Sequence, residues 1–169
     1  MEILTIAPFL DYFDKVRSRT MRLVACIPSD KLETRCAAGK FTPGDLARHI
    51  AATERYVFAE SVAGERNRYS GCARDLADGY DQVIGFMERM HSESMDIFSG
   101  LSDDDLQKKC ASADGTPMTT WKFLRSMVEH EIHHRGELYA YLGLLGVTVP
   151  PLYGLTSEQL QAIATGNTK

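Results

Sequence analysis

Apolar residues recur every three or four positions along most of the chain, which is the spacing of helices that bury one face. Stretches that contain proline and glycine interrupt this spacing and separate the helices from one another. The predicted long helices cover about residues 3–27, 43–62, 78–98 and 120–145. Because long helices in one chain pack most simply side by side, we expect an all-α fold, an antiparallel four-helix bundle.

Helix-start signals support these boundaries. Thr42 precedes a proline, so we expect it to cap the second long helix, with the proline in the first turn. Ser102 precedes three aspartates and predicts a single helical turn, whereas Thr156 and Gln159 form a capping box for a short final helix. Residues 108–118 contain an Asp-Gly pair and a proline, so we expect a loop or a short hairpin there.

The composition is that of an ordinary globular domain. The 169 residues are 44% hydrophobic and 25% charged, with a formal net charge of −4. We therefore expect a single domain over residues 1–169, with a short C-terminal extension after about residue 150, where two prolines interrupt the chain. The acidic balance argues against a nucleic-acid partner, because such proteins carry a basic surface. No apolar run approaches the roughly 18 residues of a membrane span, so we expect no membrane partner.

The cysteines and the first residues bear on the compartment. The four cysteines are scattered and form no C-x-x-C motif, and the N-terminal stretch lacks the basic region of a signal peptide. These features favour a reduced, cytoplasmic setting. The cysteines are Cys26, Cys36, Cys72 and Cys110.

The stretch HEIHH, residues 130–134, is the main chemical motif of the fourth predicted helix. In a helical projection with His130 at zero, the apolar stripe centres near about 60°, His134 lies at about 40° and His133 at about 300°. His130 and His134 are therefore expected to face inward, one turn apart, and His133 to face away. Glu131, at about 100°, shares the inward side.

Two further histidines lie on apolar helix faces. His49 is at the edge of the second stripe, and His91 is near the centre of the third. A lone inward histidine is usually a core residue with a satisfied hydrogen bond, and we interpret His91 in this way. Two imidazoles one turn apart leave several polar atoms to satisfy, which a divalent metal does at once. With His49 as the third ligand, one coordination position stays open, as in catalytic zinc sites.

A zinc protease is the first alternative, since H-E-x-x-H is one of its motifs. An extended protease motif has another histidine six residues after His134, but Ala140 stands there. The other arrangement needs a downstream glutamate on a second helix, and Glu158 follows a Pro-Pro break. The chain also predicts no sheet along which a peptide substrate would bind, so this reading is disfavoured.

A di-iron carboxylate bundle is the second alternative. Two E-x-x-H motifs, which end at His91 and His134, are the signature of such bundles. The site also needs an inward glutamate from each of the other two helices. The second helix offers Glu54 or Glu60, but the first offers only the shorter Asp14. Two of the inward histidines would then have no role, so this alternative is the weaker one.

Two motifs together resemble those of the DinB/YfiT-like family of metal-binding four-helix bundles. The motif H-x-x-x-H-R-G-x-L matches residues 130–138, and F-T-x-G-x-L-x-x-H matches residues 41–49. The resemblance covers most of the chain and implies a divalent metal, nickel or zinc, bound by His49, His130 and His134. It also implies a homodimer, and thiol-dependent transfer or isomerisation with a low-molecular-weight thiol. This chain departs from the family at Glu137, where the family often has glutamine.

These observations lead to two functional hypotheses. The first is a metal-dependent enzyme, a thiol-dependent transferase or a hydrolase, that acts on a small molecule. In this enzyme Glu131 is the candidate catalytic acid or base, unless it pairs with Arg135, four residues on. Glu54 could orient a metal-binding histidine by a hydrogen bond without binding the metal itself. The second is a non-catalytic metal-binding or dimeric interaction module, in which a fourth side chain such as His91 would close the metal site.

Overall fold

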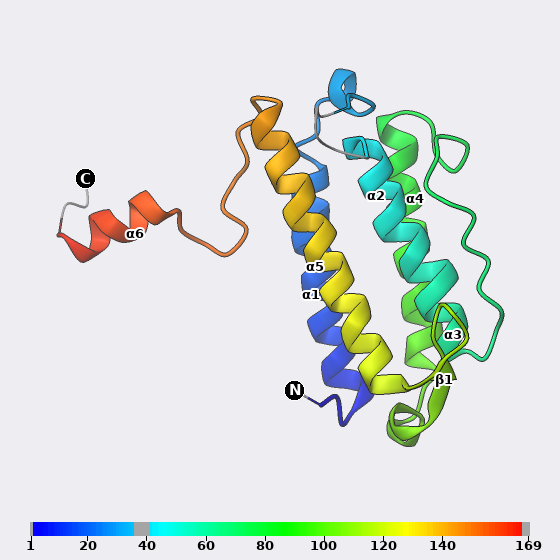
Figure 1. Cartoon of the computed structure of the whole chain (residues 1–169). Helices are drawn as coiled ribbons and strands as arrows, with labels where there is room; N and C mark the ends of the chain where they lie inside the picture. The colour runs from blue at the N-terminus through cyan, green and yellow to red at the C-terminus, as the bar shows by residue number, and fades with distance from the viewer. Residues whose placement is uncertain (1, 36–40, 167–169) are drawn as a thin grey trace.

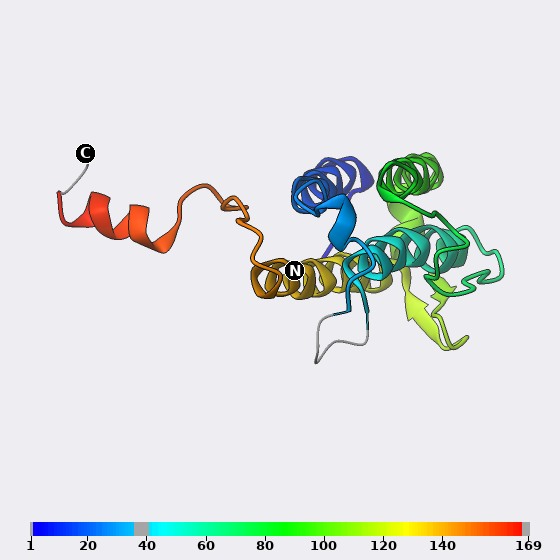
Figure 2. The ribbon, with the colours of Figure 1, turned by 90° about the horizontal axis from the view of Figure 1, so that it is seen from above.

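The protein is mainly helical. The structure, a computed structural model, describes residues 2–35 and 41–166. Figures 1 and 2 show the long helices side by side, and both α1 and α2 contact α4 and α5. The long helices are α1 (Ile6–Val24), α2 (Pro43–Thr53), α4 (Tyr80–Ser99) and α5 (Thr120–Leu144). The shorter elements are η1 (Ser29–Lys31), η2 (Glu54–Ala59), α3 (Glu60–Val62), η3 (Asp103–Gln107), β1 (Lys109–Ala111), β2 (Pro117–Thr119) and α6 (Ser157–Ala164).

The predicted helix over residues 43–62 is confirmed as one continuous rod formed by α2, η2 and α3. The Thr42 hydroxyl accepts the backbone N–H of Asp45 at 3.0 Å, and the Asp45 carboxylate accepts the N–H of Thr42 in return. These bonds satisfy donors that the first helical turn leaves free. The rod ends before Gly64, whose φ of 78° suits glycine. Its middle section, η2, is π-helical, which the apolar spacing does not predict.

The other predicted helices are confirmed, with ends that differ by a few residues. Helix α1 is shorter at both ends than predicted, and α4 and α5 agree closely with the expected ranges. Ser102 caps η3, and Thr156 caps α6 with Gln159 in a capping box, as the sequence predicts. No helix within residues 2–35 and 41–166 combines the length and hydropathy that crossing a bilayer requires.

The all-α expectation is incomplete, because β1 and β2 form a two-stranded antiparallel sheet. Lys109 pairs with Thr119, and Ala111 pairs with Pro117. A turn joins the strands, and its Gly115 has a φ of 85°. Each strand has only three residues, too few for an alternating pattern to be recognised in the sequence. The Asp-Gly pair before β2 was the available signal, and it predicted a loop or a hairpin.

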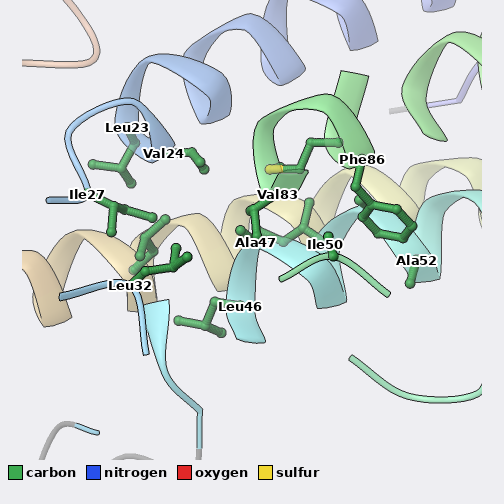
Figure 3. Close-up of a cluster of buried hydrophobic side chains, with 14 of the residues drawn as sticks. Leu23, Val24, Ile27, Leu32, Leu46, Ala47, Ile50, Ala52, Val83 and Phe86 are labelled. Carbon is green, nitrogen blue, oxygen red and sulfur yellow. The ribbon is translucent and has the colours of Figure 1, made fainter. Parts of the chain in front are cut away.

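The apolar core consists of two clusters that occupy opposite ends of the long helices. Figure 3 shows part of the first cluster, in which Leu23 of α1, Leu46 of α2 and Val83 of α4 are buried together. The second cluster includes Phe13 of α1 and Leu124 of α5. Between the two clusters lie several polar residues that are buried or half-buried. We call these residues the polar layer: Arg17 and Thr20 of α1, Glu54 of η2, His91 and Ser94 of α4, and Glu131 of α5.

Arg17 is the centre of the polar layer, and only 3% of it is exposed. Its guanidinium NH2 group donates to Glu54 and lies 3.0 Å from Oε2 of Glu131. Glu54 contacts Nδ1 of His91 at 2.9 Å, and Glu131 accepts the Thr20 hydroxyl at 2.5 Å. One network therefore joins α1, η2, α4 and α5 across the middle of the molecule.

Replacement of Arg17 by alanine is expected to lower the free energy of unfolding by about 3–5 kcal/mol, because it leaves two buried carboxylates without their cation. Urea denaturation followed by circular dichroism would measure the loss. The matched control is Lys15→Ala, which removes an exposed ion pair with Asp11 on the same helix and should cost far less. Equal losses for the two variants would contradict the central role of Arg17.

Candidate metal centre

Three histidine side chains meet between α2 and α5. His49 comes from α2, and His130 and His134 come from α5. Each offers a ring nitrogen, and these three nitrogens all lie within 4.8 Å of one another. The Nε2 atoms of His49 and His130 are 3.1 Å apart. The centre of the His134 ring is 4.6 Å from the centre of each of the other two rings. This group could hold a metal ion.

Helix geometry explains why these residues converge. His130 and His134 are four residues apart, so they lie on the same face of α5, where α2 packs. His133 is exposed, in agreement with its predicted phase. The structure therefore brings the three predicted ligands together and leaves His133 at the surface. That the three bind a metal stays a prediction.

Two of the histidines have a hydrogen-bonding partner at Nδ1. His49 Nδ1 lies 2.7 Å from the Tyr69 hydroxyl, and His134 Nδ1 lies 3.1 Å from Oε2 of Glu137. Such partners fix the ring orientation and direct Nε2 toward a metal. The sequence did not predict Tyr69 as a partner, because Tyr69 lies outside the helices, where apolar spacing carries no information. Glu137 stood out in the sequence only as a departure from the family pattern.

The protonation of the cluster suits metal binding. Burial lowers the pKa of His49 to about 4, and His134 adds a smaller effect in the same direction. Burial also lowers the pKa of His130 to about 3, with contributions from His134 and His49. Burial raises the pKa of Tyr69 to about 12, so its hydroxyl keeps its proton. The two histidines are therefore neutral at neutral pH, which is the form that binds a metal.

Glu131 lies in the polar layer, in contact with Thr20 and Arg17. Burial raises the pKa of this carboxyl group, and Arg17 opposes the shift. The alternative partner of Glu131 in the sequence was Arg135. Arg135 instead donates to the backbone oxygen of Val16 and to the Tyr153 hydroxyl. The acid or base role of Glu131 stays a prediction, and its contacts are those of a residue that stabilises the core.

Glu54 and His91 also belong to the polar layer rather than to the histidine cluster. They contact each other, and His91 Nε2 is 3.6 Å from Asp14. The carboxylates that a di-iron site would need, Glu54 and Glu131, contact Arg17 instead. This arrangement disfavours the di-iron alternative. Among the described cysteines, Cys26, Cys72 and Cys110 are free thiols, and Cys36 lies outside the described residues.

Two proteins of Bacillus subtilis resemble the chain over most of its length. The uncharacterized protein YrdA of Bacillus subtilis (strain 168) is 22% identical over 161 residues, which cover 92% of each chain. The uncharacterized protein YjoA of the same organism is 27% identical over 147 residues, which cover 85% of this chain and 93% of that protein.

Solved structures share the fold. A DinB-like protein from Bacillus cereus ATCC 10987 superimposes with a TM-score of 0.75 at 21% identity, over 89% of this chain and 99% of that one. The DinB-like protein YjoA from Bacillus subtilis gives a TM-score of 0.68 at 23% identity, over 86% and 96% of the two chains.

The family assignment rests on a match to nearly the whole chain. The model of the DinB family matches residues 4–167, a range that includes all three histidines of the cluster and every helix of the described chain. The fold agrees with this match, and we conclude that the chain belongs to the DinB family.

Proposed function

We propose that His49, His130 and His134 hold a divalent metal ion, nickel or zinc, and that the protein is a metal-dependent transferase or hydrolase that acts on a small molecule. The convergence of three ring nitrogens from two helices carries this proposal. Three imidazole nitrogen donors suit zinc and nickel better than calcium or magnesium, which prefer oxygen. The same residues are the ligands that the family resemblance implies.

The proposal of an enzyme depends on an open coordination position. Within residues 2–35 and 41–166, the group that contains His49 and His130 has three members, and neither Glu54 nor His91 is one of them. Glu54 and His91 contact each other in the polar layer. A metal ion in this cluster would supply a site at which a thiol loses its proton and becomes a nucleophile. A low-molecular-weight thiol is therefore the co-substrate that we propose.

The arrangement of the helices supports the finer description of the fold. Helices α1, α2, α4 and α5 lie side by side in Figures 1 and 2, with a shared buried core. We infer that they form an antiparallel four-helix bundle of the DinB/YfiT-like type. In this bundle the metal would lie between α2 and α5, bound by histidines that are not members of the polar layer.

Self-association into a homodimer is the second candidate role, and the exposed helix α6 favours it. This helix projects away from the rest of the molecule in Figures 1 and 2, and none of its residues is buried. It exposes the apolar residues Leu160 and Ile163. An isolated helix of eight residues is only marginally stable in water, so a partner surface would stabilise it. We propose that a second copy of the chain supplies that surface.

Metal binding is expected to depend on His130 and to be independent of His133. The affinity for zinc, measured by competition with a chromophoric chelator, should fall strongly in His130→Ala. The fall should exceed the roughly 10–100-fold loss that follows removal of a residue that only hydrogen-bonds to a metal ligand. His133→Ala is the matched control on the same helix and should bind zinc as the unmodified protein does. If both variants bind equally well, the three-histidine site is wrong.

The open position is expected to accept a thiol. In the cobalt-loaded protein, 2-mercaptoethanol should change the visible spectrum, and more so as the pH rises, because the thiolate is the metal ligand. The control is His130→Ala treated in the same way, which should show no such change. A cobalt spectrum that is indifferent to the thiol would indicate a closed, structural site and would favour the non-catalytic module.

Removal of residues 156–169 is expected to convert a dimer into a monomer, as measured by size-exclusion chromatography with light scattering. The double variant L160D/I163D should have the same effect, because a charge in each apolar contact opposes association. Leu4→Asp is the control, since Leu4 is exposed at another part of the surface. A full-length protein that is monomeric at the concentrations used would refute the dimer.

A further inference from the structure

Glu137 is held by contacts on both of its carboxylate oxygens. Oε2 lies 3.1 Å from Nδ1 of His134, one turn before it on α5. Oε1 accepts the hydroxyl of Tyr141 at 2.7 Å. The side chains of His134 and Glu137 are 12% and 26% exposed, and Tyr141 is 9% exposed. The carboxylate therefore has a defined position at the edge of the histidine cluster.

This contact determines which nitrogen of His134 is available to a metal. An ionised carboxylate accepts hydrogen bonds, so a bond from Nδ1–H of His134 to Glu137 leaves Nε2 as the nitrogen that a metal would bind. Tyr69 plays the corresponding part for His49, but it brings no charge. Among the hydrogen bonds and ion pairs of the described residues, Glu137 is the carboxylate that contacts the histidine cluster.

The charge of Glu137 changes what the cluster can accept. Three neutral imidazoles and a dipositive ion carry a charge of about +2, and one adjacent carboxylate reduces it to about +1. One thiolate or another monoanion would then make the site neutral. A phosphate dianion would leave an excess negative charge beside Glu137, and uncompensated charge in a partly buried site is costly.

We propose that Glu137, held in place by Tyr141, is a positioning residue for His134 and that its charge restricts the ligand of the metal site to monoanions such as a thiolate. This inference rests on the proposed metal site. It goes further by assigning a role to Glu137 and by naming the charge class of the ligand.

A competing role for Glu137 has to be separated by experiment. His133, His134 and Glu137 also offer ligand atoms within 4.8 Å of one another, so they could hold a second cation. The contacts favour the positioning role, because both oxygens of Glu137 are already engaged and His133 is exposed. The two roles predict different numbers of bound ions.

The first experiment measures zinc affinity and stoichiometry for the metal-depleted full chain and for Glu137→Gln. We expect one zinc per chain in both proteins. The affinity should be roughly 10–100-fold lower in the variant, as when other residues that hydrogen-bond to metal ligands are removed. The matched control is Glu129→Gln, which makes the same change in charge on the same helix at an exposed residue that pairs with Arg125. Thermal unfolding of the metal-free proteins should be the same, which separates positioning from a structural role.

The second experiment compares two probes, 2-mercaptoethanol and inorganic phosphate, on the cobalt-loaded proteins. The unmodified protein should prefer the thiol, and Glu137→Gln should shift the ratio of the two dissociation constants toward phosphate by on the order of tenfold. Glu129→Gln should leave the ratio unchanged. An unchanged ratio in Glu137→Gln would overturn the inferred selectivity.

The outcomes that refute this inference differ from those that refute the metal site. If Glu137→Gln binds zinc as tightly as the unmodified protein while His130→Ala does not, the metal site stands and the role of Glu137 is wrong. Two zinc ions per chain, reduced to one in His133→Ala, would make Glu137 a ligand of a second cation instead. If the unmodified protein binds no zinc, both proposals are wrong.

Discussion

The pairing of one buried guanidinium with two buried carboxylates is the interaction on which the arrangement of the helices depends. Arg17 enters the core from α1 and contacts Glu54 and Glu131, and Glu54 contacts His91 of α4. Charges buried in an apolar core are stable only when each has its partner. A different register of the helices would separate these groups and leave a buried charge without its partner, so the polar layer favours the observed packing between the two apolar clusters.

The same helices that form the polar layer also position the histidine cluster. Glu131 follows His130 directly on α5, and Glu54 lies five residues after His49 at the start of the π-helical segment. Because neighbouring helix positions point in directions about 100° apart, Glu131 reaches the core while His130 faces α2. Fixing the two carboxylates in the core therefore also fixes the relative position of the two helices that carry the histidines.

The chemistry of the cluster depends on its surroundings as much as on the histidines. Burial keeps His49 and His130 neutral, and Tyr69 and Glu137 orient two of the rings through Nδ1. A site of this kind has nitrogen donors ready for a metal before any ion arrives, so little reorganisation is needed on binding. Among the described residues, Glu137 brings a negative charge to the edge of this cluster through its contact with His134.

The sequence by itself determined the long helices, their caps and the faces on which His130, His134 and His133 lie, because these depend on contacts within a few residues of one helix. Helical spacing also placed His49 at the edge of its apolar face, and the family motif implies the same residue. Only the tertiary structure decided that Glu131 pairs with Arg17 rather than with Arg135, that Tyr69 reaches His49, and that α6 projects without a buried face. The Arg17–Glu131 and Tyr69–His49 contacts join residues far apart in the chain, so local spacing cannot predict them. The position of α6 likewise depends on distant parts of the fold. The hairpin of β1 and β2 has strands too short to produce a pattern of their own.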